Sequence, residues 1–140
     1  MNPVGLRQAI FTKLNVSSLT TLLTTGYGGL PAVFHEKAPQ VDDSGSAAFF
    51  PYVSFWQVTD IGFNDKLANG IEAIVQVDVW SRLDTTQCEA IAKRVYDLLH
   101  RQSLAVTGHI TTECESMDFQ RDPDGKTRHG ILRFRVLALS

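Results

Sequence analysis

The sequence predicts an α+β fold: one domain over residues 1–140, a mixed or mostly antiparallel sheet that carries an N-terminal helix and one long helix, and a C-terminal β-hairpin. Three observations support this fold class. A chain of 140 residues can bury one core without disulfide or metal staples. Apolar residues recur at helical spacing near the start and in the middle of the chain. Aromatic and β-branched residues dominate segments between and after these helices, which fits helices packed on one sheet.

The first element that we expect is an amphipathic helix over residues 3–14. Pro3 suits the first turn, where its missing N–H is not needed, and the apolar residues that follow fall on one side. A second, short helix is expected within residues 17–25, with Ser17 or Ser18 as its N-cap.

Strands are expected after this second helix. Residues 31–36 form a short β-like run. Residues 37–46, "KAPQVDDSGS", have loop composition, and we expect a flexible loop over residues 37–50.

Two long strands are expected next, over residues 51–63 and 71–82, with a turn at 65–70 between them. The second strand alternates well, and its apolar face carries Ile71, Ala73, Val75, Val77 and Val79. Its other face is only partly apolar and carries Gln76, Asp78 and Trp80.

The strongest helix signal follows at residues 88–99. Apolar residues recur there at three- and four-residue spacing, namely Cys88, Ile91, Ala92, Val95, Leu98 and Leu99. The segment "TQCE" predicts a capping box, in which Thr86 and Glu89 satisfy two free amide donors.

The stretch "RDPDGKTRHGILRFRV" (121–136) predicts the turn of a hairpin between strands 110–121 and 127–138. Proline fixes φ in this turn, and Gly125 accepts a positive φ. If Arg121 pairs with Thr127, antiparallel register sets two ion pairs on one wet face: Arg133 with Glu115 and Arg135 with Glu113. The alternate positions then face the core: Leu132, Phe134 and Val136, with Cys114.

Composition excludes several classes of function. The net charge is −2, so no overall basic field attracts nucleic acid. The two cysteines are too few for a disulfide framework, which favours a reducing compartment. No apolar run has the length of a membrane span, and the N-terminal segment does not read as a signal peptide. We therefore expect the protein to be made in the cytoplasm and to have no membrane partner.

Catalytic, cofactor and metal sites have no clear pattern in the sequence. A divalent metal held by Asp122, Asp124 and His129 is conceivable, but three basic residues are interleaved with these ligands and would repel the ion. None of the four histidines lies in a recognisable nucleophile motif. We therefore expect no catalytic residues, no cofactor and no bound metal.

The C-terminal stretch 121–136 resembles the closing hairpin of the small tail completion, or tail terminator, proteins of long-tailed bacteriophages. The segments "PYVSF" (51–55) and "VDVWSR" (77–82), the helix with "AIAKRVYDLL" (90–99) and the helix that begins near Pro3 also fit the layout of that family. The resemblance spans almost the whole chain apart from residues 37–48.

This resemblance to the family of the lambda tail terminator implies a structural protein of the virion, with no enzymatic activity. It implies a hexameric ring, assembled in the bacterial cytoplasm, that caps the finished tail tube, stops its elongation and joins the tail to the head. The implied partners are further copies of the chain, the tail tube protein and a head-completion or connector protein, and DNA only passes through the bore. We place the subunit and tube contacts on an irregular loop and on the terminal hairpin: Val41, Asp42, Asp43, Phe49, Phe50, Tyr52, Arg128, Arg133 and Arg135.

Three alternatives stay open at this point. Arg128, Arg133 and Arg135 pair either with a neighbouring subunit or within the chain, since both satisfy the same charges. A neck or head-completion protein that binds the portal side is a second reading of the same class. A small metal-dependent hydrolase that uses His129 with Asp122 or Asp124 is the third.

Overall fold

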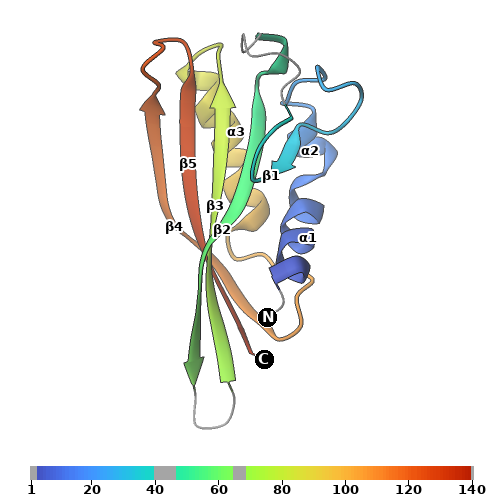
Figure 1. The fold of residues 1–140 in the computed structure, drawn as a ribbon, viewed down its shortest axis with the longest axis vertical. Coiled ribbons are helices and arrows are strands. Elements are labelled where there is room, and N and C mark those ends of the chain that lie inside the picture. The colour runs from blue at the N-terminus through green and yellow to red at the C-terminus, as the bar shows by residue number, and fades with distance from the viewer. Residues whose placement is uncertain (1–2, 40–46, 65–68, 140) are drawn as a thin grey trace.

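A five-stranded sheet with strand order β1-β2-β3-β5-β4 organises the structure, which is a computed structural model (Figure 1). It describes residues 3–39, 47–64 and 69–139. The elements are α1 (Pro3–Leu14), α2 (Ser17–Thr20), β1 (Val33–His35), the 3-10 helix η1 (Ala47–Phe49), β2 (Tyr52–Asn64), β3 (Asn69–Ser81), α3 (Thr85–Leu99), β4 (His109–Arg121) and β5 (Arg128–Leu139). The predicted α+β class is confirmed.

The sheet is mixed, as predicted, because β1 runs parallel to β2 while every other neighbouring pair is antiparallel. The expected turn at 65–70 is shorter, since Asn69 and Gly70 already belong to β3, and residues 65–68 lie outside the described residues. In Figure 1, α1 and α3 lie on the same side of the sheet, and the lower ends of β2 and β3 reach below both helices.

The hydrophobic core fills the space between this sheet and the helices. The predicted alternation of β3 is confirmed, because Ala73, Val75, Val77 and Val79 are all buried. The next strand contributes the side chains that the hairpin pattern predicted, Leu132, Phe134 and Val136, which are fully buried. Cys114 lies opposite Phe134 and is partly buried against the same core.

Helix α3 covers the sheet with the face that its sequence period predicts. Cys88, Ile91, Ala92, Val95 and Leu99 are buried, and Leu98 is partly buried.

The predicted capping box of α3 is wrong. Asp84 is the N-cap, and its carboxylate accepts the N–H of Gln87 at 2.7 Å. A carboxylate one residue before the helix satisfies a free donor of the first turn, so the helix begins two residues earlier than a cap at Thr86 would place it.

Helix α1 begins and ends as predicted, and Leu6, Ile10 and Leu14 are buried. Helix α2 is shorter than expected, and the serine cap is wrong. Val16 is the N-cap residue and makes no side-chain cap hydrogen bond, while Ser17 already lies in the helix. None of the helices in the described residues has the length and apolar character that crossing a bilayer requires.

The β4–β5 hairpin forms as predicted, but its register differs by one residue near the turn. Arg121 pairs with Arg128 instead of Thr127, and the N–H of Asp122 donates to the carbonyl of Thr127 at 2.9 Å. The register then shifts between Cys114 and Ser116. A bulge adds one residue to one strand of a pair, so positions beyond it return to the predicted alignment.

With this bulge in place, neither of the two predicted ion pairs forms between described residues. Arg135 lies opposite Glu113, as predicted, but Arg133 lies opposite Ser116 instead of Glu115. Glu115 contacts Arg135, with Nε and Oε1 3.2 Å apart. The Nε–H does not point at the oxygen well enough for a hydrogen bond. Arg133 is exposed and makes no ion pair with any residue that the structure describes.

Candidate functional site

The face of the sheet opposite the helices carries an aromatic row, which we define as Phe34, Tyr52, Trp80 and His129. The row crosses β1, β2, β3 and β5, with ring centroids 6.2 Å, 6.1 Å and 3.8 Å apart in that order. Trp80 and His129 stack nearly parallel, at 13°. Register explains the row, because Tyr52 pairs with Trp80 and Trp80 with His129.

The aromatic row covers polar side chains that a bare sheet face would leave in water. Asp78 is 5% exposed and Ser54 is 4% exposed. The indole N–H of Trp80 donates to Ser54 Oγ at 3.2 Å. Asp78 Oδ1 lies 2.8 Å from His129 Nε2 and accepts from Gln76 Nε2 at 2.9 Å. Buried polar groups need such partners, so this network has a structural explanation.

The metal site considered for Asp122, Asp124 and His129 is not assembled. His129 contacts Asp78, whereas Asp124 binds its own turn. Asp124 accepts the N–H groups of Lys126 and Thr127 at 2.8 and 2.9 Å and the hydroxyl of Thr127 at 2.7 Å. Across residues 3–39, 47–64 and 69–139, no group of three or more His, Cys, Asp or Glu side chains is arranged to hold a metal ion.

Hydrogen bonds explain the electrostatics of that turn. The two backbone N–H groups, the hydroxyl of Thr127 and, to a smaller extent, Arg82 lower the pKa of Asp124 from 3.8 to about 2. Arg82 ties the turn to the rest of the sheet. Its Nε donates to Thr127 Oγ1 at 3.2 Å, and its guanidinium lies 4.4 Å from the centroid of Phe50.

The remaining histidines are spread over the molecule. His35 is exposed at the end of β1. His100 caps the end of α3, and its Nδ1 accepts the N–H of Cys114 at 3.0 Å. His109 lies 2.7 Å from Thr112 Oγ1. None of these contacts joins a histidine to a serine or cysteine side chain in the described part of the chain.

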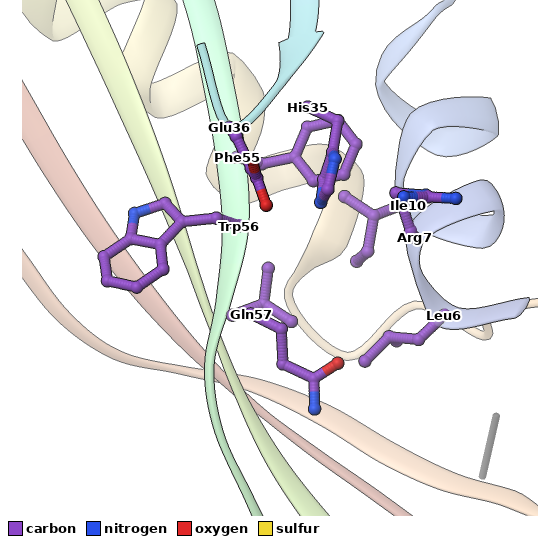
Figure 2. A pocket seen from close by; sticks show the side chains of 9 residues that line it. Leu6, Arg7, Ile10, His35, Glu36, Phe55, Trp56 and Gln57 are labelled. Atoms are coloured by element: carbon purple, nitrogen blue, oxygen red, sulfur yellow. The ribbon is translucent and has the colours of Figure 1, made fainter. Parts of the chain in front are cut away.

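A cavity of about 200 Å³ lies between α1 and β2 (Figure 2). Leu6, Arg7 and Ile10 reach it from α1, while His35 and Glu36 come from the end of β1. Partial burial and the charge of Arg7 lower the pKa of His35 below its ordinary value, and Glu36 opposes this shift. No hydrogen bond couples His35 to a second side chain in the described residues, so this cavity offers no acid–base pair.

The residues that we placed at an interface differ in where they lie in the structure. Val41, Asp42 and Asp43 lie outside the described residues. Tyr52 is buried in the aromatic row, and Phe49 and Phe50 are partly buried beside it. Arg133 and Arg135 lie on the face opposite the helices, and Arg128 faces α3 at the end of the sheet.

Two exposed aromatic side chains lie outside the set of residues that we predicted at an interface. Trp56, 38% exposed, shares one cross-strand row with Gln76 and Arg133, which defines an open-face patch. Phe119, 41% exposed, lies beside Arg121 at the end of β4. The signal for Phe119 was an apolar residue among polar ones late in a strand, which alone does not distinguish core from surface.

Comparison with known proteins gives two findings. The model of the family described as "Tail completion protein gp17" matches residues 8–138. A solved chain from "Virion of native gene transfer agent (GTA) particle" is similar in fold, with a TM-score of 0.76 and 20% sequence identity. That similarity covers 96% of this chain and 95% of the other. No curated protein matches the sequence.

Proposed function

Since this chain belongs to the Tail completion protein gp17 family, we propose that copies of it form a ring that caps a phage tail tube, stops its elongation and joins the tail to the head. Membership of the family makes it a structural component of bacteriophage tails, and the match over residues 8–138 is the observation that carries the proposal. The fold supports it, because a chain of a gene transfer agent virion has the same architecture along nearly its whole length.

A ring of identical copies needs two different surfaces on each copy that fit one another. The described chain has exposed side chains suited to such contacts. Trp56 and Arg133 of the open-face patch are residue types enriched at the centre of protein interfaces. Leu83, 73% exposed, adds an apolar side chain just after the end of β3, the strand that carries Gln76 of the patch.

Within this proposal the predicted interface set stays a hypothesis, with different roles for its members. Arg133 has no acid partner in the described chain and is available to a neighbour. Arg135 already contacts Glu115, so it needs a neighbour less. Tyr52 is buried beside Phe50 and Trp80, so its proposed role is to hold these neighbouring rings in place. Val41, Asp42 and Asp43 keep their proposed place in the contact between copies.

The charge of the protein suits a passage for DNA. A net charge of −2 on each copy gives no overall attraction to phosphates, and attraction would grow with each lysine or arginine that lines the bore. We propose that DNA passes through the ring without being held, and that the ring is assembled in the host cytoplasm before it becomes part of the virion.

The test is negative-stain electron microscopy of the purified protein, with its mass measured by light scattering over a concentration series. We expect six-fold rings of about 93 kDa, six copies of 15.5 kDa, either in free solution or on added tail tubes. A protein that stays monomeric and leaves tube ends bare contradicts the proposal. Binding to isolated portal complexes with no binding to tubes would favour the neck protein instead.

A further inference from the structure

A second cavity of about 200 Å³ lies between the start of α3 and the strand ends that flank the turn of the β4–β5 hairpin. We call it the arginine pocket. Its lining residues are Thr85, Cys88, Phe119, Gln120, Arg121 and Arg128. None of these is acidic, and two carry a full positive charge.

The two arginines of the pocket lie directly opposite each other. Arg121 of β4 pairs with Arg128 of β5, so both side chains leave the same face of the sheet. Like charges at directly opposed positions destabilise a strand pair. The free protein therefore carries a local repulsion that an anion between the two guanidinium groups would remove.

No group of the described chain supplies that anion. Neither arginine makes an ion pair with a carboxylate in the described residues. Arg128 Nη1 has one long contact of 3.5 Å to the carbonyl of Gly125, and its Nε is buried without a hydrogen-bond partner there. The carboxylate at the start of α3, Asp84, is used as the N-cap for Gln87.

The floor of the pocket is neutral and closely packed. Cys88 is 1% exposed, and burial raises the pKa of its thiol to about 11, so it carries no negative charge at neutral pH. Gly130 leaves room for its neighbours, since a Cβ there would lie 3.3 Å from both Cys88 Sγ and Phe119 Cε1. Phe119 forms an exposed aromatic rim above this floor.

We infer that the arginine pocket receives an acidic side chain of a neighbouring copy of this chain, which seats between Arg121 and Arg128 under the ring of Phe119. The inference rests on the proposed ring. A planar guanidinium binds a carboxylate through two parallel hydrogen bonds, and an aromatic rim keeps water from such a contact.

Position and charge select this occupant over others. β4 is an edge strand of the sheet, so the pocket opens at a side of the molecule. Adjacent copies in a ring contact one another through their sides. Each copy carries 15 acidic residues and a net negative charge, which supplies carboxylates and disfavours a nucleic acid as the ligand.

The experiment compares assembly of the full chain in four forms: wild type, the double variant Arg121→Glu/Arg128→Glu, Arg121→Gln, and the control Arg94→Glu. Arg94 is exposed on α3 and has no ion pair in the described residues, so its reversal changes the net charge without touching the pocket. Assembly is followed by light scattering and by electron microscopy with and without tail tubes.

We expect wild type and Arg94→Glu to assemble alike, and the double variant to need at least about tenfold more protein for the same assembly. Arg121→Gln separates binding from folding. It removes the opposed like charges, so its melting temperature should equal or exceed that of wild type while its assembly weakens.

Each other outcome overturns the inference in a recognisable way. Equal assembly of the double variant and wild type shows that the pocket is empty in the ring. Normal rings that no longer cap tubes assign the pocket to the tube protein. If the wild-type protein neither assembles nor caps tubes, the proposed ring does not form, and this result contradicts the proposed function as well as the inference.

Discussion

At the scale of single residues, His129 shows how a chemically suggestive side chain is used for structure. In the sequence it stands near two aspartates, but in the fold its partner is Asp78, on another strand. Its ring also stacks on Trp80. No local pattern links two residues so far apart in the sequence, and this is why the only acidic partners that sequence reasoning considered for the histidine were Asp122 and Asp124.

We predict that His129→Ala destabilises the protein by about 1–3 kcal/mol, because Asp78 loses a buried partner and Trp80 loses its stacked neighbour. Urea unfolding measures the change. His35→Ala is the control, since His35 is exposed and its loss should cost less than about 0.5 kcal/mol. Elemental analysis should find no metal lost from the variant, and a metal present in wild type alone would revive the hydrolase reading.

At the scale of elements, the sequence predicted every long strand and both long helices, because hydrophobic period is a property of whole segments. It failed at their ends and registers. We predicted Thr86 as the N-cap of α3, whereas Asp84 is the N-cap. The two residues lie two positions apart and both have side chains that can cap a helix. The bulge near Glu115 has no sequence signal of its own, so one of the two predicted cross-strand alignments was lost.

The cap of α3 gives a direct test. Asp84→Ala should lower the free energy of unfolding by about 1 kcal/mol, since the N–H of Gln87 loses its acceptor at the first turn. Thr86→Ala, inside the same turn, should change it by less than about 0.5 kcal/mol. The reverse order, measured by thermal or urea unfolding, would restore the capping box.

The turn of the β4–β5 hairpin gives a pH dependence. The pKa of Asp124 is lowered in the folded chain, so its ionised form favours folding. That contribution is complete above the ordinary pKa of 3.8 and is lost as the pH falls toward about 2. In thermal melts, wild type should therefore lose stability more steeply than Asp124→Asn between about pH 4 and pH 2.

Asp118→Asn is the matched control for this experiment. Asp118 is exposed on β4 and accepts no hydrogen bond from the described residues. Its variant should follow the wild-type curve. Parallel curves for wild type and Asp124→Asn would show that the turn does not depend on this carboxylate.

At the scale of the whole molecule, the two faces of the sheet have different tasks. One face is covered by α1 and α3 and holds the core (Figure 1). The other is covered by its own aromatic row, which leaves Trp56 and Arg133 exposed beside it. The family to which this chain belongs is one of phage tail proteins, which assemble with other proteins. Exposed tryptophan and arginine side chains are the types that contribute most to binding at protein interfaces.

Reversing one charge on this face separates binding from folding. Arg133→Glu should weaken assembly and leave the melting temperature unchanged, because Arg133 has no acid partner in the described chain. Arg135→Glu is the comparison, since it breaks the contact with Glu115 and should lower the melting temperature slightly. A lower melting temperature for Arg133→Glu with normal assembly would show that its role lies within the chain.

The strand order has a consequence for how the protein is made. β5 is the last strand in the sequence, yet it lies inside the sheet between β3 and β4. During synthesis, β3, α3 and β4 therefore leave the ribosome before β5, the strand that pairs with both β3 and β4. Pairings between segments far apart in the sequence also form slowly. Until residues 128–139 emerge, β3 has one open edge and α3 lacks much of the surface it covers. Chains that stop short of this strand should be degraded or aggregate, which keeps unfinished copies out of the particle.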